Sequence, residues 1–265
     1  MNVIKDKLAI FSKGDQANQP IIFIHGFPFD QGMWEQQVKT FSSDFYCITY
    51  DIRGLGSSPV GDGQFTLEMF VDDLFGIIEE LKLNRPVLCG LSMGGYIALR
   101  AIERDEEKFK ALILCDTKSA ADNDETRLKR AAGIKRINTE GVQKYVSEFI
   151  PNCFAEKSIE KLGSEYKSIL ENSMKYIPAG VKGCLLAMAV RTDTTGYLSR
   201  IKIPVLLLCG EKDKLTPPDV MKEMADKITS SEFHIVSGSG HISPVENPDY
   251  VNEKISAFLK RIIKA

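Results

Sequence analysis

The 265-residue sequence lacks the features that direct a protein to nucleic acids or membranes. Its 34 lysines and arginines nearly balance its 36 aspartates and glutamates, so the formal net charge is only −2 and favours no polyanionic partner. No apolar run reaches the roughly 20 residues that span a bilayer, and residues 1–7 lack the apolar stretch of a signal peptide. We therefore expect a cytoplasmic protein with no nucleic-acid or membrane partner, as a monomer or a homodimer.

The sequence also lacks any C-x-x-C pair, which argues against the common zinc sites and redox motifs. Most of its six cysteines fall within short apolar runs, and their spacing matches no disulfide framework. They are Cys47, Cys89, Cys115, Cys153, Cys184 and Cys209. We expect buried, reduced thiols that pack as small apolar side chains, and neither a metal nor a cofactor.

Short apolar runs alternate with helical patterns along most of the chain. The runs predict strands at residues 20–25, 46–50, 86–89, 111–115, 204–209 and 232–236. Most of them are continuously apolar, which is typical of parallel strands that helices cover on both faces. Helical stripes follow at 67–83 and 92–102, and Thr216-Pro217 and Asn247-Pro248 predict two further helix starts. The fold class is therefore α/β, with a mostly parallel, doubly wound sheet.

The alternation stops between residues 116 and 201, where no strand is predicted. Helices are expected instead, at residues 123–137, 142–150, 159–174 and 181–190. Their apolar faces need a surface to cover, and the nearest one is the edge of the sheet. We predict a core of residues 1–117 and 200–265, with a helical cap of residues 118–199 inserted in it.

One motif joins the predicted strand at 86–89 to the helix behind it. It reads Gly90-Leu91-Ser92-Met93-Gly94, a G-x-S-x-G sequence in a strand-to-helix context. Such a sharp turn lifts the serine hydroxyl clear of the surface, and glycines two residues to either side let the backbone turn tightly. Ser92 is therefore the predicted nucleophile, which needs a base to take its proton.

A histidine in a glycine-rich loop supplies the candidate base. His241 follows the strand at 232–236 and is preceded by Gly238 and Gly240, whereas His25 precedes a glycine turn and His234 lies within a strand. Imidazole has an ordinary pKa of about 6.5, so it accepts and returns a proton near neutral pH. His241 is thus predicted to act on Ser92.

A carboxylate beyond a strand end can orient that histidine. Asp213 is the candidate acid, since it follows the strand at 204–209. Glu211 and Asp116 are alternatives, because each also follows a strand. Acyl chemistry further needs N–H donors for an oxyanion, and the backbone N–H groups of Phe27 and Met93 are the candidates.

Together these motifs resemble the α/β-hydrolase superfamily. The segments that carry the resemblance are 25–28 (His-Gly-Phe-Pro), 51–58, 90–95, 210–213 and 240–241. The chain is most similar to the small bacterial serine esterases, including 3-oxoadipate enol-lactonases and the cofactor-free haloperoxidase or perhydrolase esterases. Epoxide hydrolases and haloalkane dehalogenases share some of these motifs but use an aspartate where this chain has Ser92.

The resemblance implies a carboxylesterase or lactonase that forms an acyl-enzyme on Ser92. Its substrate would be a small to medium apolar acyl or aryl ester, or a lactone, in a pocket formed by Phe27, Phe29, Trp34, Met93 and Met188, although Trp34 suits the core equally well. An enol-lactone substrate, which carries carboxylates, would need a cation in the pocket, for which the cap offers Arg127, Arg130, Arg136 and Arg191. The alternatives are a C–C bond hydrolase, a perhydrolase favoured by Pro28 in the oxyanion loop, and a ligand sensor.

Overall fold

A single eight-stranded sheet forms the centre of the molecule, with strand order β1-β2-β4-β3-β5-β6-β7-β8. The computed structural model describes residues 2–3 and 8–264. The strands are β1 (Asn2–Val3), β2 (Ala9–Lys13), β3 (Pro20–Ile24), β4 (Tyr46–Tyr50), β5 (Val87–Leu91), β6 (Ala111–Cys115), β7 (Val205–Gly210) and β8 (Ser231–Val236). Only the β1–β2 and β2–β4 pairings are antiparallel among these strands. The mostly parallel sheet predicted from the sequence is confirmed.

All six strands predicted from apolar runs are present, with ends that differ by at most two residues. The sequence did not reveal β1 and β2. Strand β2 lies near the antiparallel edge, and its last three residues are partly or fully exposed. It therefore lacks the continuous apolar pattern that marks a strand covered on both faces.

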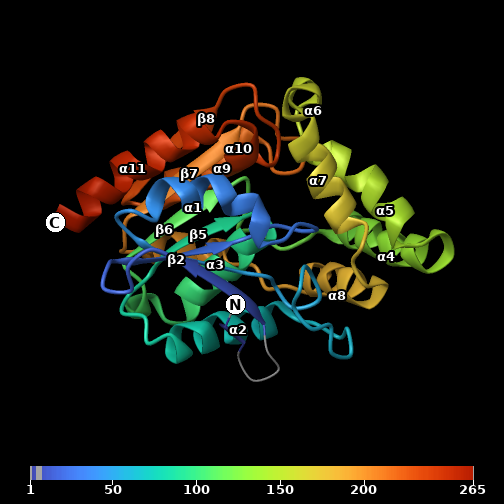
Figure 1. The fold of residues 1–265 in the computed structure, drawn as a ribbon, viewed down its shortest axis with the longest axis horizontal. Helices are drawn as coiled ribbons and strands as arrows, with labels where there is room; N and C mark the ends of the chain where they lie inside the picture. The colour runs from blue at the N-terminus through green and yellow to red at the C-terminus, as the bar shows by residue number, and fades with distance from the viewer. Residues whose placement is uncertain (1, 4–7, 265) are drawn as a thin grey trace.

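Helices cover both faces of the sheet. They are α1 (Glu35–Phe41), α2 (Leu67–Glu80), α3 (Met93–Arg104), α9 (Pro218–Lys227), α10 (Ser243–Glu246) and α11 (Pro248–Lys264), with the short 3-10 helices η1 (Gln31–Trp34) and η2 (Glu106–Lys108). Helices α1 and α11 pack together on one face, and α2 packs against α3 on the other (Figure 1). The five strands from β3 to β7 are thereby shielded from water on both sides, which explains their largely apolar sequences, whereas β2 and β8 are partly exposed.

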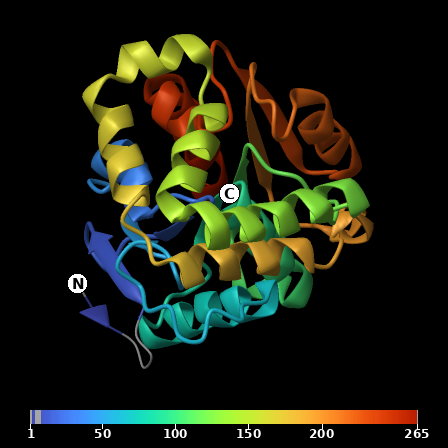
Figure 2. The same cartoon turned by 90° about the vertical axis from the view of Figure 1, so that its right-hand side faces the viewer.

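Between β6 and β7 the chain forms only helices, which we call the helical insertion (residues 118–199). It contains α4 (Asp124–Glu140), α5 (Val142–Phe149), η3 (Ile150–Cys153), α6 (Glu156–Leu162), α7 (Ser164–Ser173), α8 (Pro178–Ala189) and the start of η4 (Thr195–Arg200). Helices α4 and α8 lie side by side, as Figure 2 shows. The single helix predicted at 159–174 is divided into α6 and α7 at Gly163, whose φ of +47° ends α6.

The helical insertion is tied to loops of the core by hydrogen bonds. Ser173 at the end of α7 donates to the carbonyl of Pro28 over 2.9 Å, and the Tyr176 hydroxyl lies 3.2 Å from the Asp30 carboxylate. Both partners lie in the loop after β3. This loop is therefore held between the sheet and the insertion, at the edge where the parallel strands end.

The strand order places a crevice at this edge. The chain passes from β3 outward to β4 and then returns to β5 on the other side of β3. Open α/β sheets bind ligands at such a switch point, outside the carboxyl ends of the strands. Among the described residues, all six cysteines are buried and unpaired, as the sequence predicted, and no helix has the length and apolar content to cross a membrane.

Candidate active site

Ser92 occupies a strained turn between β5 and α3. Its backbone has φ 52° and ψ −113°, a conformation that a residue with a side chain rarely adopts. The turn is closely packed, because a Cβ on Gly90 would lie 2.4 Å from the carbonyl oxygen of Gly94. A Cβ on Gly26, in the loop after β3, would lie 3.3 Å from the Cβ of Ser92. Small residues on both segments thus bring the β3 loop against the serine.

A pair of helical glycines tests this packing. A Cβ on Gly94 in α3 would lie 2.2 Å from the Ile24 carbonyl oxygen, whereas one on Gly76 in α2 would meet no atom within 4 Å. We expect Gly94→Ala to lower the free energy of unfolding by about 1–3 kcal/mol through overpacking. Gly76→Ala should raise it by roughly 0.5–1 kcal/mol, since alanine favours a helix. Urea denaturation of the two variants measures both effects, and equal shifts would contradict the close approach.

Three side chains from separate strand ends form one hydrogen-bonded chain. The Ser92 hydroxyl lies 2.8 Å from Nε2 of His241, and Nδ1 of His241 lies 2.8 Å from Oδ2 of Asp213. Ser92 follows β5, Asp213 follows β7 and His241 follows β8. If Nδ1 carries the proton and donates it to Asp213, Nε2 is free to accept the serine proton.

Asp213 is held as a carboxylate by several donors. Its oxygens accept hydrogen bonds from the backbone N–H groups of Leu215 and Thr216 and from the Thr216 hydroxyl, besides the histidine. Burial opposes its ionisation, but His241 and these hydrogen bonds outweigh that effect and lower its pKa. Thr216 is consequently not the helix cap that the sequence predicted: its hydroxyl bonds to Asp213, and α9 begins one residue later, at Pro218.

The pKa of His241 is raised. Burial opposes the charged ring, but the Asp213 carboxylate outweighs this effect, with smaller contributions from Asp116 and Glu246. The loop itself is fixed: the His241 N–H donates to the Cys153 carbonyl over 2.8 Å, and Glu246 accepts from the N–H groups of Gly240 and Ala155. The histidine loop is thereby bonded to the helical insertion.

Neither alternative acid makes a hydrogen bond to His241. The exposed Glu211 carboxylate accepts from the Gly238 N–H and from Lys212. Asp116 is buried, and its two oxygens accept from the N–H of Gly210 and from Ser243. Asp116 therefore connects the end of β7, just before Asp213, to the segment just after His241.

The pH dependence of catalysis should report the charge of Asp116. Burial, followed by the nearby Asp213 carboxylate, raises the pKa of Asp116 to about 7, so it carries partial negative charge near neutrality and raises the pKa of His241. The base predicted at His241 must be unprotonated to act, so we expect kcat/KM to fall as the pH drops through the His241 pKa. We expect Asp116→Asn to move this acid limb to lower pH, and the exposed Glu211→Gln to leave it in place. If the acid limb of Asp116→Asn stays at the wild-type pH or moves to higher pH, the charge of Asp116 does not raise the pKa of His241.

The other two histidines have different surroundings. His25 is buried, with Nδ1 2.9 Å from the Gly26 carbonyl oxygen and Nε2 accepting from the Ile52 N–H. Burial lowers its pKa, so it is a neutral connector between two loops. His234 lies on the edge strand β8, with Nε2 3.9 Å from the Glu232 carboxylate.

The backbone N–H groups of Phe27 and Met93 belong to the two segments that meet at the serine, the loop after β3 and the start of α3. Met93 is the first residue of α3, and Phe27 directly follows the Gly26 that contacts Ser92. Within the described residues neither N–H donates a hydrogen bond. The first N–H groups of a helix have no partner inside the helix, so the Met93 N–H can serve an anion.

A cavity of about 490 Å³ opens above Ser92 and His241. Its apolar wall comes from the core and the helical insertion and includes Phe27, Tyr96, Tyr145, Phe149, Leu185 and Met188. Of the five side chains that the sequence assigned to the pocket, Phe27 and Met188 line this cavity, whereas Met93 is fully buried in the hydrophobic core. Tyr145 and Phe149 also line the cavity but were not predicted as pocket residues, although they belong to the amphipathic stripe of α5.

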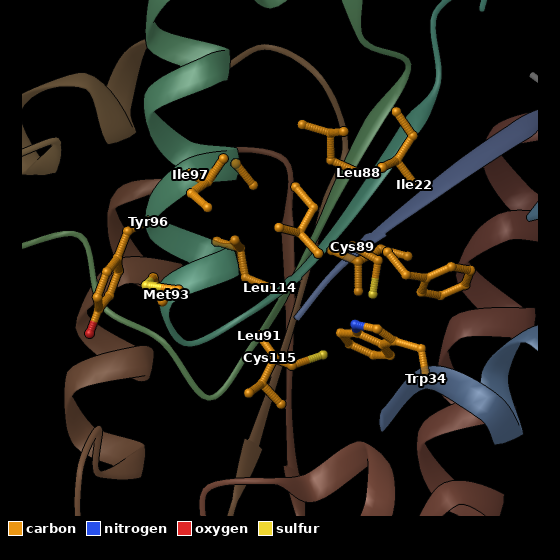
Figure 3. Close-up of a cluster of buried hydrophobic side chains, with 14 of the residues drawn as sticks. Ile22, Trp34, Leu88, Cys89, Leu91, Met93, Tyr96, Ile97, Leu114 and Cys115 are labelled. Carbon is orange, nitrogen blue, oxygen red and sulfur yellow. The ribbon is translucent and has the colours of Figure 1, made fainter. Parts of the chain in front are cut away.

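The assignment of Trp34 and Phe29 to this cavity is corrected by the structure. Trp34 is fully buried, with its ring centroid 5.3 Å from that of Phe23 on β3, and Figure 3 shows it in the core with Cys89 and Cys115. Phe29 lines a separate cavity of about 170 Å³ against α7. The Phe29 N–H donates to the Gly26 carbonyl oxygen over 3.0 Å, which closes a tight turn at Phe27 and Pro28, and neither Phe29 nor Trp34 beyond this turn lines the cavity above Ser92.

The cavity is also lined by five cationic side chains, and by no aspartate or glutamate among the described residues. They are Lys118, Lys129, Arg130, Arg136 and Lys214. Of the four arginines named from the sequence, Arg130 and Arg136 thus reach the cavity. Arg127 is exposed and bonds to Asp124, whereas Arg191 is buried against Asp122.

One cluster near the site has the composition of a metal site. Ligand atoms of Asp116, Cys209 and Asp213 lie within 4.8 Å of one another. Burial raises the pKa of the Cys209 thiol far above its usual value, and both carboxylates already accept several hydrogen bonds. A protonated thiol is a poor metal ligand, so the cluster fits a hydrogen-bonded network better than a cation.

The fold and this arrangement define an α/β hydrolase. Residues 19–248 match the family model described as the alpha/beta hydrolase fold, so the chain belongs to that family. The chain is 28% identical to 3-oxoadipate enol-lactonase 2 of Acinetobacter baylyi over 248 residues, which cover 93% of this chain and 91% of the relative.

Solved structures are also similar. A thermophilic esterase from Thermogutta terrifontis, studied with malate bound, superposes with a TM-score of 0.92 and 33% identity, over 97% of this chain and 94% of the other. A bromoperoxidase from Bacillus anthracis gives a TM-score of 0.85 at 24% identity, over 96% and 95% of the two chains, and shares the fold. The chain therefore belongs to a family of hydrolases that act on small molecules, with esterase and enol-lactonase relatives.

Proposed function

We propose that the protein hydrolyses carboxylic esters or lactones through an acyl-enzyme on Ser92. The observation that carries this proposal is the chain of two 2.8 Å contacts that joins Ser92 to His241 and His241 to Asp213 at the floor of the cavity. The esterase and the enol-lactonase among its relatives support the same class of reaction.

In the first half-reaction, the Ser92 hydroxyl attacks the acyl carbon while Nε2 of His241 takes its proton. Asp213 keeps the ring in the required tautomer and stabilises its positive charge. The N–H groups of Phe27 and Met93 bind the oxyanion, which typically contributes a factor of about 10²–10³ in rate for each donor. His241 then gives the proton to the leaving alcohol.

In the second half-reaction, water attacks the acyl-enzyme and His241 acts again as base. The acid leaves and Ser92 regains its proton. The helical insertion acts as a cap in this proposal, because Tyr145, Phe149, Leu185 and Met188 close the apolar side of the cavity. Such a wall suits small to medium acyl or aryl groups.

Ester hydrolysis tests the proposal directly. Phenyl and p-nitrophenyl esters of increasing acyl length should be hydrolysed with burst kinetics where deacylation is slow. Peracid formation with added hydrogen peroxide and cleavage of a dienoate are measured with the same preparation. A protein that cleaves the dienoate but no ester or lactone would be a C–C bond hydrolase, and one that turns over none of them would fit a ligand sensor.

A further inference from the structure

The five cationic side chains of the cavity differ in how far nearby carboxylates neutralise their charge. Arg136 is paired with Glu140 and Glu148, and Lys129 is paired with Glu125 over 2.7 Å. These pairs lie at the exposed rim and need no ligand. Lys214 is exposed to solvent. The two remaining cations, Lys118 and Arg130, are more buried, with 21% and 16% of their side chains exposed.

Lys118 and Arg130 share a single carboxylate with a third cation. Asp122 is fully buried at its side chain and lies 3.4 Å from Nζ of Lys118, 2.9 Å from Nε of Arg130 and 2.5 Å from Nη1 of Arg191. Three positive charges therefore surround Asp122, and Asp193 adds a second negative charge beside Arg191. Arg191 is only 1% exposed and also donates to two backbone carbonyls, with its guanidinium 4.0 Å from the Tyr96 ring centroid. The surplus positive charge lies on the two residues that face the cavity.

Donor groups remain available on these two residues. Arg130 uses Nε for Asp122, and its two terminal nitrogens bond to no group among the described residues. The pKa of Lys118 is lowered, chiefly by burial and then by the charge of Arg191, as expected for a cation with too few negative neighbours. A guanidinium fork and an ammonium group side by side are suited to a carboxylate.

We propose that the substrate carries a carboxylate away from its scissile bond, and that Lys118 and Arg130 are the specificity-determining residues that bind it. This inference rests on the proposed ester or lactone hydrolysis and adds the charge class of the substrate. A bound carboxylate would join Asp122 and Asp193 and so balance the three cations, in a partly desolvated wall where charge-assisted hydrogen bonds are strong. The apolar side chains opposite would hold the segment between this carboxylate and the scissile carbonyl.

Matched pairs of esters test the proposal. Monomethyl glutarate and its amide isostere, methyl glutaramate, place the charge on the acyl side. Acetyl esters of 4-hydroxybenzoate and 4-hydroxybenzamide place it on the leaving group. In each pair, kcat/KM for the carboxylate is divided by that for the amide, at low salt. We expect a ratio of about 10–100 in at least one series, the value of one to two charge-assisted hydrogen bonds.

Variants then assign the effect to residues. Lys118→Met and Arg130→Met should each lower the ratio by about tenfold, and the double variant should bring it near one. Arg127→Met is the matched control, because Arg127 lies one turn before Arg130 on α4 but outside the cavity, and it should leave the ratio unchanged. The amide esters monitor folding and catalysis in every variant.

The two proposals fail in different ways. Wild-type ratios near one in both series, or a ratio that the double variant retains, would overturn the carboxylate proposal while ester hydrolysis stands. Absence of hydrolysis for both members of every pair, or hydrolysis that survives Ser92→Ala, would overturn the proposed function itself.

Discussion

Ser92→Ala is expected to lower kcat for ester hydrolysis by a factor on the order of 10⁶, which leaves only what binding and the oxyanion donors supply. The reason is chemical: no other hydroxyl lies within hydrogen-bond distance of Nε2 of His241 among the described residues. Steady-state hydrolysis of p-nitrophenyl acetate, corrected for the spontaneous rate, measures this loss.

The same variant should keep its thermal midpoint. Alanine retains the Cβ, so it keeps both the packing of the turn and the backbone strain at φ 52°. An unchanged midpoint with lost activity separates chemistry from folding. Activity retained within tenfold of the wild type would place the nucleophile elsewhere.

Asp213→Asn is expected to lower kcat by a factor of about 10⁴. An asparagine that still accepts from the N–H groups of Leu215 and Thr216 turns its NH₂ group toward His241. The imidazole would then accept a hydrogen bond from that NH₂ group at an unprotonated Nδ1 and carry its own proton on Nε2. A protonated Nε2 cannot take the hydroxyl proton of Ser92. Kinetics on a reactive and an unreactive ester would show the loss in kcat, with KM little changed.

Two matched carboxamide substitutions serve as controls for Asp213→Asn. Glu211→Gln alters an exposed carboxylate on the same loop, and Asp116→Asn alters a buried one that bonds to Gly210 and Ser243 rather than to the histidine. Each should cost far less in kcat than Asp213→Asn. If either control costs as much as Asp213→Asn, or Asp213→Asn loses less than tenfold, the acid has been assigned to the wrong residue.

Much of the site could be predicted from the sequence because the sheet is parallel. Continuously apolar runs showed which strands are covered on both faces, and the carboxyl ends of parallel strands lie along one edge. Residues that follow different strands therefore meet there, as Ser92, Asp213 and His241 do. The glycines around Ser92 added the local turn, since only small residues permit it.

Side-chain direction could not be predicted in the same way. Asp116, Glu211 and Asp213 all follow strands at this edge, and only the turn from Asp213 to Thr216 decides which oxygen faces the ring. An aromatic residue near the site is equally suited to the core or to the cavity, and Trp34 belongs to the core.

The charge of the cavity wall could not be predicted from the sequence either, because it depends on which cations of the helical insertion form ion pairs with which carboxylates. Asp122 brings Lys118 and Arg130, which are close to it in sequence, together with Arg191, which follows α8. The arginines of the insertion were candidates from the sequence, but Lys118 was not. Its position just beyond β6, at the edge where the other site residues lie, was the available signal.

Covalent labelling of the nucleophile is the most direct measurement. The protein is treated with a fluorophosphonate, and its intact mass and peptides are compared with those of Ser92→Ala and of Asp213→Asn. We expect one adduct per chain, located on Ser92, with none in Ser92→Ala and much slower labelling in Asp213→Asn. A wild-type protein that remains unlabelled, or an adduct on any residue other than Ser92, would contradict a serine nucleophile activated by His241 and Asp213.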